Sequence, residues 1–71
     1  MQYAIVIEQA QNNYSAYVPD LPGCIATGQT IEDVTREIQA AIQFHLEGLR
    51  AEGLPIPPAT SEVRMVEVAG L

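Results

Sequence analysis

The chain has 71 residues, of which 9 are Asp or Glu and 3 are Lys or Arg, so its net charge is −6. This length allows one small domain and leaves no room for a second. Nucleic-acid binding by phosphate neutralisation needs clustered cations, and the three arginines are far apart in sequence, so we expect no direct DNA or RNA binding. The excess of acidic over basic residues instead suits a basic protein partner.

The cysteine and histidine content limits the disulfides and metal sites that the chain can form. The single cysteine, Cys24, excludes an internal disulfide, and the single histidine, His45, gives no Cys/His cluster for zinc. The N-terminus lacks the cationic region of a signal peptide, and no apolar run approaches the roughly 20 residues of a membrane span. We therefore expect a cytoplasmic protein with no metal, no cofactor and no membrane segment, whose small core gains stability from self-association.

The N-terminal residues predict a β-hairpin. Residues 3–8 are mostly apolar at both odd and even positions, which favours a central strand. The polar cluster at 11–13 is typical of a turn, because Asn accepts the left-handed conformation. Residues 14–18 then return as a second, antiparallel strand, and Pro19 ends its pairing because proline has no N–H to donate.

A second turn and a third strand follow. Pro22 and Gly23 fit the two central positions of a type II turn, which require a fixed φ and then a positive φ. Residues 24–27 predict a short third strand, and Gly28 interrupts it.

One long amphipathic helix is the clearest element of the sequence. Thr30 is a good N-cap, Asp33 stands where a capping box has its acid, and Gly53 with the prolines after it ends the helix. Glu32 and Arg36 predict an ion pair at i,i+4. A single apolar stripe runs along the helix at Ile31, Val34, Ile38, Ala41, Ile42, Leu46 and Leu49.

Residues 62–69, after a proline-rich loop, are interpreted as a last strand. The predicted fold is therefore α+β with the order β-β-β-α-β, a mostly antiparallel sheet with one long helix packed on one face. A single helix covers only one face of a sheet, and Ala4 and Val6 are apolar on the opposite face. We expect a second copy to cover them, giving a homo-dimer or a dimer of dimers.

Four segments also match the pattern of a known family: 14–24 (YSAYVPDLPGC), 26–33 (ATGQTIED), 41–49 (AIQFHLEGL) and 53–57 (GLPIP). On these segments the chain resembles the HicB antitoxins. The resemblance implies a partly degraded RNase H-like fold and an antitoxin that covers the active site of a small basic HicA toxin, an mRNA-cleaving ribonuclease. Longer members add a C-terminal DNA-binding module, and we expect residues 1–71 to be a single HicB-like domain without one.

The candidate partner-binding residues are Tyr17, Asp20, Leu21, Pro22 and Phe44. Residues 19–24 also have a purely structural explanation, because Pro22 and Gly23 reverse the chain and Asp20 can cap backbone N–H groups. Phe44 lies off the apolar stripe by helical phase, where an aromatic is either edge packing or an interface anchor.

Other reactive side chains have simpler explanations. A buried thiol is favoured for Cys24 over a nucleophile, which needs a base and a lowered pKa. His45 shares the apolar stripe, so a packed ring is favoured over a pH-sensitive interface contact. Glu8, Asp20 and Glu67 lie near the ends of predicted strands, yet they have no recognisable metal-site spacing, and solvated surface acids explain them.

Together these patterns favour a non-enzymatic antitoxin that binds a small basic toxin. Two alternatives stay open at this point. One is a structural homo-oligomer of the same fold that has no toxin, and the other is a metal-dependent RNase H-like nuclease.

Overall fold

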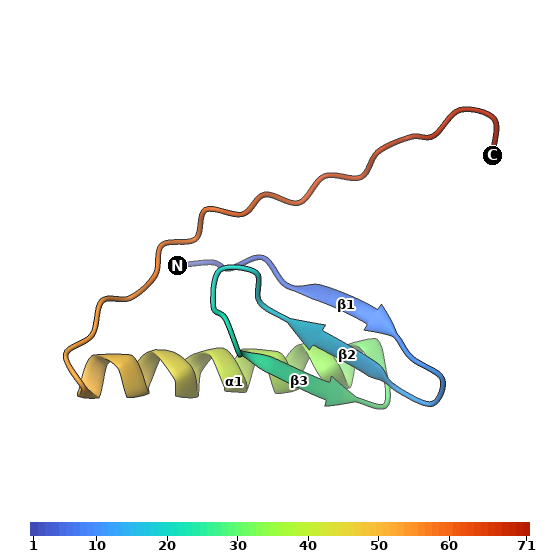
Figure 1. Ribbon diagram of the computed structural model, residues 1–71. Coiled ribbons are helices and arrows are strands. Elements are labelled where there is room, and N and C mark those ends of the chain that lie inside the picture. The colour runs from blue at the N-terminus through green and yellow to red at the C-terminus, as the bar shows by residue number, and fades with distance from the viewer.

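Three strands and one helix make up the regular structure of the computed structural model (Figure 1). The strands are β1 (Val6–Gln9), β2 (Tyr14–Tyr17) and β3 (Ile25–Gly28), and helix α1 (Ile31–Ala51) follows them. Both strand pairs are antiparallel, and the sheet has the order β1-β2-β3 with α1 packed on one face. The predicted α+β arrangement is confirmed.

The strand register divides side chains between two faces of the sheet. Ala16 and Ala26 are partners on β2 and β3, and both pack in the core under α1. Val6, Tyr17 and Ile25 are partners across all three strands. They point to the outer face, because successive side chains of a strand alternate. The sheet thus has an inner face, where Ile7, Ala16 and Ala26 pack into the core, and an outer face with a row of large apolar side chains.

Small residues under the helix allow it to approach the sheet closely. The buried core consists of Ala16, Val18, Leu21, Cys24, Val34 and Ile38. α1 packs mainly against β3 and β2. Gly28, predicted as a break, is the last residue of β3, and a Cβ atom built on it would lie 2.5 Å from the backbone nitrogen of Val34. Its missing side chain therefore makes room for the first turn of α1.

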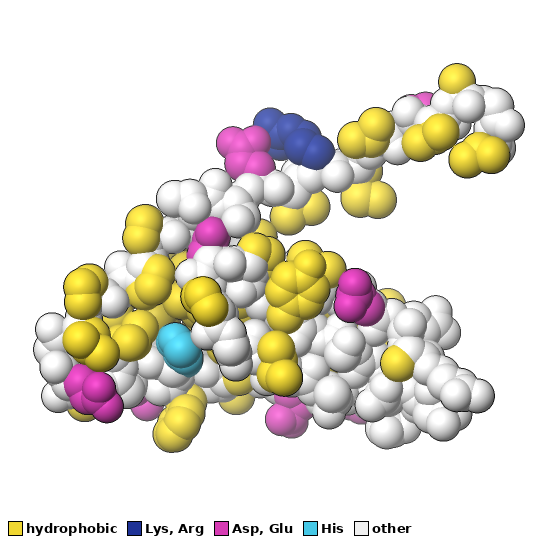
Figure 2. Space-filling model, viewed as in Figure 1, with side chains coloured by type: hydrophobic (Ala, Val, Ile, Leu, Met, Phe, Trp, Pro, Cys, Tyr) yellow, Lys and Arg dark blue, Asp and Glu magenta, His cyan; other side chains and the backbone are white.

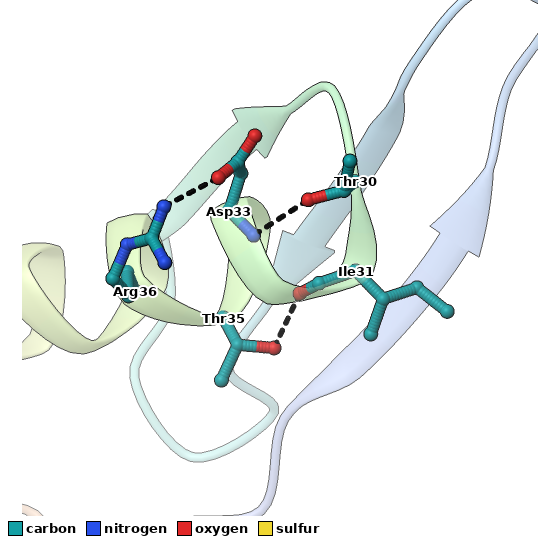
Figure 3. A network of polar contacts seen from close by, with 5 residues as sticks. All are labelled: Thr30, Ile31, Asp33, Thr35 and Arg36. Atoms are coloured by element: carbon teal, nitrogen blue, oxygen red, sulfur yellow. Dashed lines mark hydrogen bonds and ion pairs between the residues drawn. The ribbon is translucent and has the colours of Figure 1, made fainter.

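The start of α1 has the predicted cap (Figure 3). Thr30 Oγ1 accepts a hydrogen bond from the backbone N–H of Asp33 at 3.0 Å, which satisfies one of the unpaired donors of the first turn. The Asp33 carboxylate pairs with Arg36. The predicted Glu32–Arg36 pair is therefore wrong, because residues three apart on a helix are also neighbours and Arg36 takes this closer partner.

The end of α1 follows the glycine signal. Gly53 has φ +70°, its N–H donates to the carbonyl of Arg50 at 3.1 Å, and the N–H of Leu54 donates to that of Leu49 at 2.8 Å. This pair of bonds is a Schellman motif, which needs a left-handed residue at the position of Gly53.

The predicted last strand does not form within the chain. Residues 62–69 are exposed and pair with no strand of the sheet. Their backbone is extended, and Glu62 and Arg64, two residues apart, form an ion pair of 3.0 Å on the same side. Figure 1 shows this segment, here called the tail, leaving the domain on the side of β1 and running beyond it. A strand needs hydrogen bonds from a neighbour, and the tail has none.

Candidate partner-binding surface

An exposed apolar pair lies on the outer face of the sheet. Tyr17 and Ile25 are Cα partners on β2 and β3, and 41% and 70% of their surfaces are exposed. Their neighbours Val18 and Cys24 are buried. Because side chains alternate along a strand, burying those neighbours directs Tyr17 and Ile25 into solvent.

A groove links this pair to the helix. It has a volume of about 400 Å³ and lies between the turn after β2, the start of β3 and the second half of α1. Ile25 and Phe44 line it from opposite sides, and His45, half-buried, lies next to Phe44. Phe44 is 80% exposed. Ile25 thus pairs with Tyr17 on the sheet and shares the groove with Phe44, and we call these three exposed residues the β3-side surface.

Two of its members were candidates from the sequence, and Ile25 was missed. Strand alternation could have identified Ile25. It is a large residue between Cys24 and Ala26, two small residues that face α1, so its side chain points to the other face. Monomeric proteins rarely expose a contiguous group of large apolar side chains unless a partner covers it. Such a surface is suited to protein–protein contact, where aromatic residues are enriched.

The turn between β2 and β3 has the predicted geometry. Gly23 has φ +83°, and the N–H of Cys24 donates to the carbonyl of Leu21 at 3.1 Å, as in a type II turn. Pro22 is exposed and adjoins the groove residue Gly23. Leu21, however, is 0% exposed. Its side chain belongs to the core and offers no surface to a partner, which corrects its assignment to the candidate contact set.

Asp20 holds the chain that follows the proline loop. One carboxylate oxygen accepts the backbone N–H groups of Thr60 and Ser61 at 3.1 and 3.0 Å, and the other accepts their hydroxyl groups at 3.1 and 2.9 Å. These hydrogen bonds, that from the Ser61 N–H first, hold the pKa of Asp20 below its ordinary value. The capping explanation of Asp20 is thus correct in kind, although the capped groups lie some forty residues away in sequence.

Cys24 and the acidic residues offer no catalytic arrangement. Cys24 is buried, and desolvation raises the pKa of its thiol, which confirms a packed rather than an activated cysteine. No group of three or more His, Cys, Asp and Glu side chains is placed to hold a metal ion. Glu8, Asp20 and Glu67 therefore do not converge, as the carboxylates of a two-metal nuclease must.

Positive charge does not gather on the molecule. Arg36 pairs with Asp33, and Arg64 pairs with Glu62 at 3.0 Å. Figure 2 shows basic side chains only on the tail, beside an acidic one, and none on the visible side of the folded body. α1 lacks the hydrophobicity that a membrane-crossing helix requires.

Of the two residues expected at an oligomer interface, Val6 belongs to the outer row of the sheet, and Ala4 precedes it on the same face. Val6 is the Cα partner of Tyr17, and Ala4 shares its parity just before β1. Both are half-buried rather than exposed. The outer face thus carries apolar side chains from β1 across to β3.

The chain is similar to one known protein family and to several of its relatives. Residues 3–69 match the model of the HicB_like antitoxin of bacterial toxin-antitoxin systems. A UPF0150 protein of Helicobacter pylori is 37% identical over 65 residues, covering 90% of each chain. An uncharacterized 14.9 kDa protein of Haemophilus phage HP1 is 37% identical over 57 residues, which are 80% of this chain. This chain spans only 43% of that phage protein.

A solved structure is similar over most of the fold. A chain of a HicA3 and HicB3 toxin-antitoxin complex matches with a TM-score of 0.71 and 33% sequence identity. The match covers 83% of this chain and 70% of that one.

Proposed function

The chain belongs to the HicB-like antitoxin family, and we propose that it neutralises a small basic HicA-type ribonuclease by binding over the toxin's active site. The observation that carries this proposal is the likeness, at 33% identity, to a chain solved in a HicA3 and HicB3 complex. The protein then acts by binding alone, without catalysis. We place the complex in the cytoplasm, where the mRNA substrate of such a toxin is found.

The β3-side surface supplies the contacts in this proposal. Tyr17, Ile25 and Phe44 are exposed and apolar, with Ile25 paired to Tyr17 in the sheet and lining the same groove as Phe44. A few buried aromatic or aliphatic anchors usually carry most of the affinity of a protein complex. Pro22, exposed on the adjoining turn, extends the contact at its rim.

Charge supports the same kind of partner. A ribonuclease presents cations to the phosphate backbone of RNA, so a domain with a net charge of −6 competes for that surface. Glu52 lines the same groove as Phe44, and we expect it to face such cations. The acids mainly raise the association rate, because exposed charges steer an encounter more than they hold a complex. Added salt is therefore expected to slow association and leave dissociation nearly unchanged.

The test uses the small basic protein encoded beside this chain and measures the dissociation constant of the pair. Phe44→Asp is expected to weaken binding about 30-fold or more, the effect of losing an anchor worth about 2 kcal/mol. The control is Ile31→Asp, which makes the same charge change at a side chain 49% exposed. Ile31 lies about 20 Å from Phe44 along the helix axis, and an acid there suits the helix N-terminus.

Three outcomes would contradict the proposal. The first is equal affinity of Phe44→Asp and the unmodified chain. The second is an equal loss in Phe44→Asp and Ile31→Asp, which would place the contact elsewhere. The third is the absence of any complex on a sizing column, with the neighbouring protein still toxic in excess of this chain. The third result would favour the alternative of a structural homo-oligomer without a toxin.

A further inference from the structure

The tail has large apolar side chains that no other part of the chain covers. Val63, Met65, Val66 and Val68 are between 60% and 93% exposed, four large apolar residues within eight positions. Figure 2 shows the hydrophobic side chains spread along this protruding arm. The radius of gyration is 14.1 Å, whereas a compact chain of this length has about 11 Å. An extended apolar segment of this kind is a strand that lacks its neighbour.

The sheet has a free edge on β1, which is four residues long. In the hairpin the N–H of Ala10 donates to the carbonyl of Asn13 at 2.8 Å. Because hydrogen-bonded pairs alternate along an antiparallel ladder, Val6 and Glu8 bond to β2 while Ile7 and Gln9 direct their backbone groups away from it. Sheet order confirms that no strand lies on that side. β1 therefore offers unpaired donors and acceptors to an added strand.

A groove beside this edge leaves part of the helix uncovered. It has a volume of about 790 Å³ and is lined by the N-terminal residues 1–5, by α1, and by Ala59 and Ser61 just before the tail. Ile42 and Leu46 line it and are only half-buried, since α1 packs mainly on β3 and β2. A strand added next to β1 would extend the sheet over this flank of α1. One added strand would therefore supply a neighbour for β1 and could also reach the groove, which borders the residues just before β1.

The anchored start of the tail directs it outward. Asp20 binds Thr60 and Ser61, and the Tyr3 hydroxyl donates to the carbonyl of Pro57 at 2.5 Å. These contacts fix the chain beside the N-terminal end of β1, and beyond them the tail runs clear of its own sheet (Figure 1). A second copy carries both the strand and the edge, and a two-fold arrangement satisfies both in each copy at once.

We propose that two copies of this chain exchange their tails, residues 62–69 of each adding as a strand to the free edge of β1 in the other and covering the groove on α1. This interface is separate from the β3-side surface, which lies at the opposite edge of the sheet. The proposal does not depend on the identity of a toxin.

Light scattering on the full chain during size exclusion tests the exchange. The mass is expected to be about twice the 7.7 kDa of one chain, or a further doubling of that. The tail variant Met65→Asp/Val66→Asp is expected to lower the mass to one chain. Gln9→Pro is expected to do the same, because it removes an outward N–H from an exposed edge position and leaves the hairpin ladder intact. Ile25→Asp, at the other edge, is the control and keeps the mass of the unmodified chain.

Mixing the two blocked variants distinguishes exchange from other contacts. The tail variant keeps a free β1 edge, and Gln9→Pro keeps an intact tail, so together they are expected to form a heterodimer seen by native mass spectrometry. Both changes are at exposed positions, and circular dichroism checks that α1 persists in each. A monomeric unmodified chain, an oligomer that survives the tail variant, or a mixture without heterodimer would each overturn the proposal.

Discussion

Replacing Gly28 by Ala tests the packing of α1 on β3 most sharply. A Cβ atom at this position would lie 2.5 Å from the nitrogen and 2.8 Å from the Cα of Val34, and 3.0 Å from the carbonyl carbon of Asp33. All three are backbone atoms of the first turn of α1, so no side-chain rotation relieves the clash. The helix start must move away from the sheet, which disturbs the burial of Val34 and the Thr30 cap.

The expected loss is about 1–3 kcal/mol, the usual effect of overpacking a close contact. A core of this size supplies about 3–5 kcal/mol in total, so the variant loses a large share of its stability. Gly48→Ala is the matched control, because its added Cβ would meet nothing within 4 Å inside the same helix. The Gly48→Ala substitution is expected to stabilise the fold by about 1 kcal/mol, because alanine has a higher helix propensity than glycine.

Urea unfolding followed by far-ultraviolet circular dichroism measures both variants at one protein concentration, since self-association would make stability depend on it. The two alanines should shift the midpoint in opposite directions. A Gly28→Ala protein as stable as the unmodified chain would refute the close approach of α1 to β3.

Three further predictions follow from individual side chains. The pKa of Asp20 is lower in the folded protein than its ordinary value of 3.8. Its hydrogen bonds to Thr60 and Ser61 are therefore expected to be fully formed above pH 3.8 and to be lost as the pH falls through the lowered pKa. Amide exchange at those two residues measures this, and should rise in Asp20→Ala at neutral pH. Leu21→Ala removes a fully buried side chain and should cost about 2–5 kcal/mol, enough to leave the chain largely unfolded by circular dichroism. The Cys24 thiol should react with a disulfide reagent only slowly in the folded protein and rapidly in urea, whereas equal rates would contradict its burial.

Local signals in the sequence were sufficient for most of the fold. The Pro22–Gly23 turn, the Thr30 cap and the Gly53 stop depend on the chemistry of a few adjacent residues, and all three are present in the structure. The apolar stripe of α1 likewise identified Val34 and Ile38 as core residues. These features were predictable because their partners lie within a few residues.

The features that were missed depend on distant partners. Leu21 in a turn sequence resembles a surface residue, and it is buried because the fold brings it into one core cluster with Val34 and Ile38 of α1. Ile25 joins Tyr17 and Phe44 through strand register and helix placement, neither of which is visible in local composition. The β-pattern of the tail was recognised, but a pattern cannot indicate whether the partner strand lies in the same chain.

Ribonuclease activity of the neighbouring basic protein, assayed on an mRNA with increasing amounts of this chain, tests the central claim most directly. Cleavage is expected to stop near one chain per toxin, and Phe44→Asp should need a large excess to reach the same inhibition. Cleavage that continues unchanged with the unmodified chain in excess would contradict the antitoxin mechanism proposed for the β3-side surface.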